Sequence, residues 1–288
     1  MVNTAHLPTL SEMTARAHPD HPFALVARFN RPDQRNALTG QTVDDLTALA
    51  TAITLGQTGV RALVLTGTGG SFSAGGDLSR FSRDADGLKK ANRAFGALLM
   101  MLDRLPVPLI SLVNGAAFGG AVGLMAVSDL VIARKDAKMA MSETTLGLPP
   151  AQIAPFVAAR IGRIRARQMA LLGGHHDGQS AHALGLVDET AEDNAALETA
   201  LARHLGNIRR TAPEANAVTK GLINRTGAEV TEATLDAAAD AFMTAMGRSE
   251  AQEGLRAFLN KDTPDWAETE AETGAESGAD TPPDEARP

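Results

Sequence analysis

The chain has 288 residues, with 27 basic and 34 acidic side chains, 3% aromatic residues and no cysteine. Residues 267–288 hold seven of the acids and one arginine, so the rest of the chain is close to neutral. A near-neutral body with few aromatic rings argues against a nucleic-acid partner. The lack of cysteine excludes disulfides, thiol catalysis and cysteine-ligated metals, and it favours a reducing compartment, which we expect to be the cytoplasm.

The first residues lack the basic region and apolar core of a secretory signal, so no secretory signal is expected. We expect residues 1–20 to form an N-terminal leader segment before the core domain. Residues 107–127 contain no charged side chain and are long enough to cross a bilayer. However, Asn114-Gly115 and Gly119-Gly120 interrupt this segment. The interruptions predict a buried strand, a tight turn and a buried helix, so no membrane partner is expected.

Strands and helices are predicted to alternate through a core domain that spans residues 21–205. The hydrophobic periodicity predicts strands at 23–29, 60–66, 108–113 and 130–133, and helices at 42–55, 88–105 and 120–128. Alternation of this kind predicts an α/β fold with parallel strands and right-handed crossovers.

Helical periodicity dominates the C-terminal part of the chain. Further helices are predicted at 195–205, 213–224, 232–246 and 249–259, and residues 206–266 therefore form a helical C-terminal region. After Trp266 the composition changes to Ala, Glu, Thr, Gly, Asp and Pro. Such a segment buries too little apolar area to offset its ordering entropy, so we expect a disordered acidic tail at 267–288.

Two glycine clusters carry the main chemical signal. Residues 72–78 read FSAGGDL just after a predicted strand, and residues 114–120 read NGAAFGG just before a predicted helix. Ligands of α/β proteins usually bind where strands end, and an amide at a helix start lacks an intrahelical acceptor. Two such N–H groups aimed at one carbonyl oxygen would stabilise an enolate. Taken alone, the first cluster is more typical of an ordinary glycine turn, and the second cluster is what favours a site.

These two motifs resemble the enoyl-CoA hydratase/isomerase (crotonase) superfamily, as do SDLVIA at 128–133 and SETTLGL at 142–148. The resemblance implies a crotonase-like ββα spiral core and a helical C-terminal region that closes a trimer, which often pairs into a hexamer. It also implies an acyl-CoA thioester as the partner, with coenzyme A as part of the substrate and no separate cofactor.

The resemblance assigns roles to individual residues. Gly76 and Gly120 match the donors of the oxyanion hole, and Glu143 matches the second of the two catalytic glutamates. Gly123 occupies the position of the first glutamate, so only one carboxylate remains. Burial beside a thioester would raise the pKa of Glu143 and suit it to proton transfer near neutrality. The positions that match coenzyme A contacts are Arg35, Ala37, Ala74, Asp77, Leu78, Phe258 and Lys261.

Two further polar positions have simpler interpretations. Asp129 lies at a helix-to-strand junction, where a cap or turn role is expected. His175 and His176 are adjacent, point apart and lack a spaced third ligand, so we predict a loop and no metal site there.

Three functions remain open. A single base suffices for 3,2-enoyl-CoA isomerisation, because it removes a C2 proton and returns it at C4. Residues 119–124 and 146–157 are more similar to bacterial hydratases of branched glutaconyl-type acyl-CoAs, such as methylglutaconyl-CoA and isohexenylglutaconyl-CoA hydratases. We therefore expect a 2-enoyl-CoA hydratase, with the isomerase as the alternative. The loss at Gly123 keeps a non-catalytic CoA-binding protein as a third hypothesis.

Overall fold

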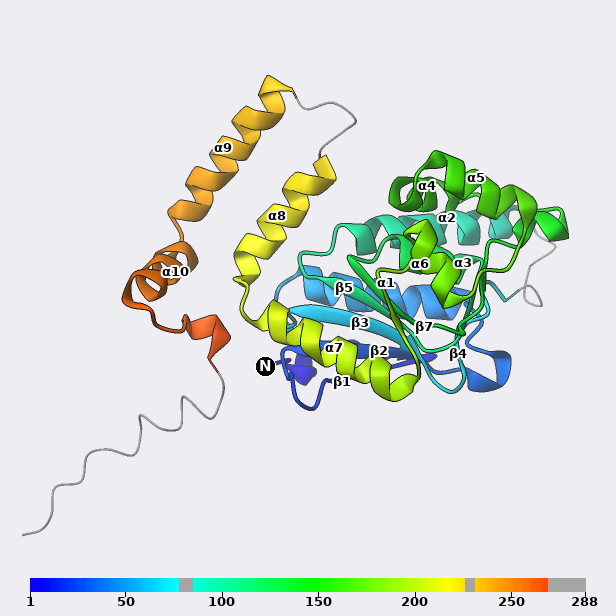
Figure 1. Ribbon diagram of the computed structural model, residues 1–288, viewed down its shortest axis with the longest axis horizontal. Helices are drawn as coiled ribbons and strands as arrows, with labels where there is room; N and C mark the ends of the chain where they lie inside the picture. The colour runs from blue at the N-terminus through cyan, green and yellow to red at the C-terminus, as the bar shows by residue number, and fades with distance from the viewer. Residues whose placement is uncertain (78–84, 226–230, 269–288) are drawn as a thin grey trace, which may run out of the picture.

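The computed structural model describes residues 1–77, 85–225 and 231–268 (Figure 1). Its main sheet has six strands in the order β1-β2-β3-β5-β7-β9, all parallel to their neighbours except β1, which runs antiparallel to β2. The strands are β1 Met13–Ala17, β2 Ala24–Phe29, β3 Ala62–Gly67, β5 Leu109–Val113, β7 Leu130–Arg134 and β9 Glu189–Ala191. The α/β architecture predicted from the alternating pattern is confirmed.

Both faces of the main sheet are covered. Side chains that alternate along the strands divide between two cores, because successive residues of a strand point to opposite faces. One face packs against helix α7 (Asn194–Arg209), which crosses in front of the sheet in Figure 1. The other face carries the larger core. It packs against α1 (Gly40–Thr54), α2 (Ala85–Asp103) and α3 (Gly120–Ala126).

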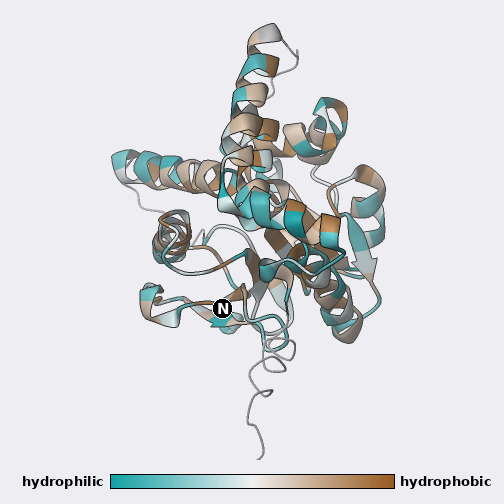
Figure 2. Ribbon diagram, turned by 90° about the vertical axis from the view of Figure 1, so that its left-hand side faces the viewer, coloured by the Kyte–Doolittle hydropathy of each residue, from teal (hydrophilic) through white to brown (hydrophobic). Residues whose placement is uncertain are grey.

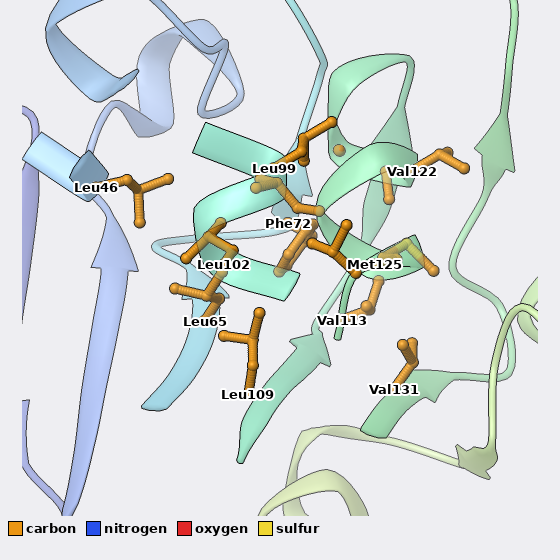
Figure 3. Close-up of a cluster of buried hydrophobic side chains, with 14 of the residues drawn as sticks. Leu46, Leu65, Phe72, Leu99, Leu102, Leu109, Val113, Val122, Met125 and Val131 are labelled. Carbon is orange, nitrogen blue, oxygen red and sulfur yellow. The ribbon is translucent and has the colours of Figure 1, made fainter. Parts of the chain in front are cut away.

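The larger core joins the sheet to the helices that surround the candidate site. Figure 3 shows Leu99 of α2 and Val122 of α3 next to Phe72, above Leu109 and Val113 of β5. All five side chains are fully buried. Fully burying one such side chain stabilises a fold by about 1.5–3 kcal/mol, so this packing fixes α2 and α3 relative to the strand ends.

A second, three-stranded parallel sheet lies at the carboxyl ends of the main strands. Its order is β4-β6-β8, with β4 Ser71–Ser73, β6 Ala116–Phe118 and β8 Met139–Ala140. The sequence reasoning missed this sheet, because strands of two or three residues show no readable periodicity. The remaining short elements are η1 Thr4–His6, η2 Pro32–Gln34, η4 Glu143–Leu146, α4 Ala154–Ile161, α5 Arg163–Leu172 and α6 Gly178–Leu184.

Helices α8 (Pro213–Arg225), α9 (Glu232–Met246) and α10 (Ser249–Asn260) extend away from the sheet (Figure 1). Their surface retains hydrophobic segments, as Figure 2 shows. The exposed large hydrophobic side chains of these helices include Ile223, Leu235, Phe242, Met243, Leu255, Phe258 and Leu259. Among the described helices, none combines the length and hydropathy needed to cross a membrane.

Three predicted boundaries fall within secondary-structure elements or beside buried residues of the structure. The leader predicted at 1–20 contains β1, whose Met13 is buried and pairs with Phe29. The core predicted to end at 205 continues to Arg209, because α7 is not interrupted there. The first residue of the tail predicted at 267–288, Ala267, closes the 3-10 helix η5 (Asp265–Ala267) and is buried; residues 269–288 lie outside the described residues.

Candidate active site

Each strand of the small sheet leads into one predicted catalytic position. Gly76 comes three residues after β4, Gly120 comes two residues after β6, and Glu143 comes three residues after β8. Because the three strands are parallel, their carboxyl ends meet at one edge of the small sheet. The fold therefore gathers two glycine amides and one carboxylate from segments that are about 20 to 45 residues apart in the chain.

The segment around Gly76 is fixed by a parallel bridge to Leu38. The Leu38 amide donates to the Gly75 carbonyl at 2.7 Å, and the Asp77 amide donates to the Leu38 carbonyl at 2.9 Å. In this pattern the intervening Gly76 turns its own N–H away from Leu38. A Cβ on Gly120 would lie 3.2 Å from Leu38 Cδ1, so Leu38 is close to both glycines.

The Gly120 amide is the first N–H of α3 and has no acceptor within its helix. The N–H groups of Gly76 and Gly120 make no hydrogen bond to another group in the described part of the chain. A Cβ on Gly75 would lie 2.6 Å from the Phe118 carbonyl oxygen, so the two glycine segments touch. Two neighbouring amides without protein acceptors can bind an oxyanion.

Two asparagines brace the loops that lead into the site. The side-chain amide of Asn114 donates to the Gly67 and Gly69 carbonyls at 3.1 and 2.8 Å. Asn36 is 1% exposed and has a left-handed φ of 57°. Its side-chain amide donates to the Thr68 and Ser71 carbonyls. These side chains satisfy backbone groups that the turns leave unpaired.

Asp77 is held in a buried ionic network. Arg31 Nη2 lies 3.2 Å from Asp77 Oδ2, and the two side chains are 12% and 11% exposed. Arg31 also donates from Nη1 to the Ala37 carbonyl at 2.8 Å and pairs through Nε with Glu12 at 3.4 Å. Glu12 in turn accepts hydrogen bonds from Thr39 and Thr42 at the start of α1. The network fixes the loop that contains Arg31 to the segment that contains Asp77.

Glu143 begins η4 and turns its carboxylate toward α3. A Cβ on Gly119 would lie 3.1 Å from Glu143 Oε1. Oε2 is buried and has no hydrogen-bond partner in the described part of the chain. Desolvation therefore raises the pKa of Glu143 above its ordinary value, while a backbone hydrogen bond at Glu143 lowers it by less. A carboxyl group whose pKa is raised in this way is a stronger base when ionised, which favours proton transfer.

Two features of the structure require a glycine at position 119. Its φ of 52° and ψ of −117° lie in a region that side chains disfavour. Its missing side chain also leaves the room that the Glu143 carboxylate occupies. The glycine before Gly120 therefore turns the chain into α3 and admits the acid at the same time.

Gly123 lies one turn further along α3, and the space beside it is filled by hydrocarbon. A Cβ on Gly123 would lie 2.4 Å from Ile153 Cγ2 and 3.3 Å from Leu99 Cδ1. Ile153 is 3% exposed and Leu99 is fully buried. The position that resembles the first family glutamate therefore has no room for a longer side chain.

The remaining predicted contacts separate into two groups. Arg35 is exposed, and its carbonyl accepts the Ala74 amide at 2.9 Å, so Arg35, Ala37, Ala74 and Asp77 lie together beside Gly76. Leu78 falls outside the described residues. Phe258 and Lys261 lie at the end of α10 and are exposed.

The end of α10 is held far from the glycines of the same chain. Trp266 follows α10 after a short turn, and its carbonyl accepts a hydrogen bond from Arg61, the residue before β3. Gly76 instead follows the carboxyl end of β3 by way of β4. The two regions therefore lie at opposite ends of the main sheet (Figure 1). Within one chain, Phe258 and Lys261 are not brought to the site.

Comparison with known proteins identifies the family. The sequence profile described as enoyl-CoA hydratase/isomerase matches residues 24–269. The chain belongs to the enoyl-CoA hydratase/isomerase family. The crotonase fold and the acyl-CoA chemistry expected from the motifs are thereby shown at the level of the family.

Named members of the family include both reaction types. A putative enoyl-CoA hydratase of Thermus thermophilus is 32% identical over 250 residues, which cover 83% of this chain and 95% of the relative. The 1,2-epoxyphenylacetyl-CoA isomerase of Escherichia coli is 33% identical over 246 residues, covering 82% and 92%. The solved structure of Pseudomonas aeruginosa AtuE has a TM-score of 0.85 and 41% identity, covering 90% of this chain and all of that chain.

The structure also adds residues that the sequence reasoning missed. Ile153 and Leu99 occupy the space beside Gly123, and Arg31 and Glu12 hold Asp77. The sequence did contain one signal: Gly123 stands where the family pattern has an acid. The space left by the missing acid side chain had to be filled by a large side chain from elsewhere. The sequence does not say which residue fills the gap, because Leu99 and Ile153 come from separate segments.

The polar positions interpreted as structural have such roles. Asp129 accepts the Leu109 amide at 2.7 Å and pairs with Lys220 at 2.6 Å. His176 exchanges backbone hydrogen bonds with Met139, and Asp177 caps α6. Across residues 1–77, 85–225 and 231–268, no three histidine or acidic side chains are grouped as metal ligands.

Proposed function

We propose that this protein is an acyl-CoA hydratase that adds water to the double bond of a 2-enoyl-CoA thioester. The observation that carries the proposal is the half-buried Glu143 carboxylate, whose Oε2 is buried without a partner and which lies against the turn that presents the Gly120 amide. Similarity to the Thermus enoyl-CoA hydratase and to the 2,3-dehydroadipyl-CoA hydratase of Escherichia coli supports it.

The proposed reaction begins with the thioester oxygen between the amides of Gly76 and Gly120. Ionised Glu143 takes a proton from water as the water oxygen bonds to C3, and the electron pair of the double bond moves toward the thioester oxygen. The resulting enolate is stabilised by the two N–H donors, each worth about 3 kcal/mol of barrier in typical oxyanion holes. Glu143 then returns a proton to C2, which restores the carboxylate and releases the 3-hydroxyacyl-CoA.

The coenzyme A part is proposed to lie along the loops that contain Arg35, Ala37, Ala74 and Asp77. The exposed Arg35 guanidinium suits a phosphate. Asp77 is already paired with Arg31, so its proposed contact with the ligand is through the backbone. Phe258 and Lys261 would meet the coenzyme A of a second copy in a homotrimer or hexamer, because they lie far from the site of their own chain.

One observation favours 3,2-enoyl-CoA isomerisation as a second candidate. Ile153 and Leu99 fill the space beside Gly123, so this chain has one carboxylate where two would help to hold and polarise water. A single base can move a proton from C2 to C4 while the oxyanion hole holds the dienolate. The 1,2-epoxyphenylacetyl-CoA isomerase of Escherichia coli shows that named relatives include an isomerase, although the substrate in its name is an epoxide and not a 3-enoyl ester.

The deciding experiment measures product mass after turnover of 2-enoyl-CoA, 3-enoyl-CoA and 3-methylglutaconyl-CoA in deuterated water. Addition of one water to a 2-enoyl ester supports the hydratase, and conversion of the 3-enoyl ester without added water supports the isomerase. Intact CoA-ester binding without turnover of any ester would support a non-catalytic protein. Glu143→Gln is the matched control, because it keeps the size of the side chain and removes its proton transfer.

A further inference from the structure

The two proposed oxyanion donors are held in place by different means. Gly120 begins α3, where a Cβ would lie 3.2 Å from both Leu38 Cδ1 and Phe95 Cζ, so a helix and two packed side chains fix its N–H. Gly76 is exposed, follows the end of β4 and meets Leu38 in an isolated parallel bridge. Because a glycine backbone is conformationally free, the direction of the Gly76 N–H needs a further constraint.

One guanidinium group spans both sides of this bridge. Arg31 Nη1 donates to the carbonyl of Ala37, the residue before Leu38, at 2.8 Å. Nη2 of the same group lies 3.2 Å from Oδ2 of Asp77, the residue after Gly76. A planar guanidinium presents its N–H groups in a fixed fork, so the two contacts set the distance and orientation of one backbone segment relative to the other.

The guanidinium is itself anchored from a third direction. Its Nε lies 3.4 Å from Oε1 of Glu12, whose Oε2 accepts the hydroxyl of Thr42 at 2.7 Å. The side chains of Arg31, Asp77 and Glu12 are largely buried, which limits screening by water and strengthens their ion pairs relative to exposed ones. Arg31 therefore cannot swing away from the bridge without giving up both ion pairs.

We infer that Arg31 is a positioning residue, whose guanidinium aims the Gly76 amide at the thioester oxygen by joining Ala37 to Asp77. The inference rests on the proposed function, because it needs the oxyanion hole, and it adds a residue that acts through Gly76 rather than on the substrate. Loss of one oxyanion donor lowers kcat by about 10²–10³-fold, so a misdirected donor should lower kcat by part of that range.

The test observes the thioester carbonyl directly, in butyryl-CoA that carries carbon-13 at that position. This saturated ester has no double bond to hydrate or move, and hydrogen bonds to its carbonyl oxygen lower the C=O stretching frequency. Infrared difference spectra should give a lower frequency for the ester bound to the wild type than for the free ester. Arg31→Lys keeps the positive charge and loses the fork, so about half or more of that shift should disappear and kcat should fall by about tenfold.

Arg160 supplies a matched control, because it makes the same kinds of contact at the other end of the main sheet. Its Nη2 lies 2.5 Å from Oδ2 of Asp188, Nη1 donates to the Ser128 carbonyl at 2.5 Å, and its side chain is as buried as that of Arg31. Ser128 lies two residues before β7, so these contacts are at the amino ends of the strands. Arg160→Lys should lose stability much as Arg31→Lys does and should leave the carbonyl frequency unchanged.

The full shift in Arg31→Lys would overturn the inference, as would a wild type that binds the ester without any shift. Asp77→Ala removes the same contact from the other segment, and an unchanged frequency in that variant would count equally against it. An equal loss in Arg160→Lys would show that general loosening, and not the bridge, moves the carbonyl. If the wild type hydrates no enoyl ester, yet shows a shift that Arg31→Lys removes, the positioning role stands and the hydratase proposal fails.

Discussion

Two glycines one turn apart, Gly119 just before α3 and Gly123 within it, leave space for opposite kinds of side chain. At Gly119 the missing side chain admits the Glu143 carboxylate, whose Oε2 is buried without a partner. One turn on, at Gly123, the missing side chain admits Ile153 and Leu99. A buried, unpaired carboxylate is costly to keep, whereas interlocked hydrocarbon stabilises the fold. The first position thus makes room for the carboxylate proposed as the acid/base, whereas the second is filled by packing.

The largest expected effect comes from removing the acid. Glu143→Gln should lower kcat by about 10²–10⁴-fold, the usual contribution of a positioned general acid/base. The variant should still bind a saturated acyl-CoA, because glutamine keeps the size of the side chain and leaves the Gly76 and Gly120 amides in place. Steady-state kinetics and calorimetry measure the two effects. Unchanged turnover would show that the proton is moved by another group.

The packing around Gly123 is tested by placing an acidic side chain at this position. Gly123→Glu should lower the free energy of unfolding by about 3 kcal/mol or more, because the new side chain meets Ile153 and brings a carboxylate into hydrocarbon. Urea unfolding measures the loss. Adding Ile153→Ala should recover part of it by opening space beside residue 123. A single variant as stable as the wild type would mean that the space is not filled as described.

Substitution of Gly119 tests the space that the Glu143 carboxylate occupies. Gly119→Ala should reduce kcat by about tenfold with little change in KM, because the new Cβ strains the backbone and displaces the Glu143 carboxylate. Gly162→Ala is the control, since Gly162 has a φ of 80° and its Cβ would meet no atom within 4 Å. Both variants carry backbone strain, but only the first should lose activity. An equal loss in both would argue that strain alone is responsible.

The smallest expected effect is the pH dependence of stability. Burial raises the pKa of Glu143 in the folded state, so the folded protein holds this proton more tightly than the unfolded chain does. Stability from this group is present below the unfolded pKa and is lost as pH rises through the folded pKa. Glu143→Gln should therefore melt at a higher temperature than the wild type at pH 7 and at a similar temperature near pH 3. A lower Tm at pH 7 would contradict an unpaired buried carboxylate.

Much of the fold was readable from the sequence, because its long strands and helices have strong periodicity. The strand predicted at 108–113 and the helix predicted at 232–246 lie within one residue of β5 and α9. The small sheet was not readable, although it brings Gly76, Gly120 and Glu143 together. Its strands have two or three residues, and their pairing depends on tertiary contacts that no local pattern records.

The catalytic candidates were found through motifs, while their supporting residues were not. The motifs assigned no role to Arg31, whose guanidinium contacts Asp77, Glu12 and the Ala37 carbonyl. Glu12 lies in a segment predicted to be a leader. Long-range ion pairs and complementary packing, such as Ile153 against Gly123, join residues from distant parts of the chain. One sequence contains no signal for such pairs.

The hydrogen bonds of Arg61 show where helices α8, α9 and α10 could be removed from the chain. Its guanidinium donates to the carbonyls of Arg209 and Thr211, where the chain leaves α7, and to the carbonyl of Trp266, where it returns from α10. The excursion through α8, α9 and α10 therefore starts and finishes within the reach of one side chain. This segment could therefore be removed as a unit. A short turn joining residues near 211 and 266 would bypass it without crossing the molecule.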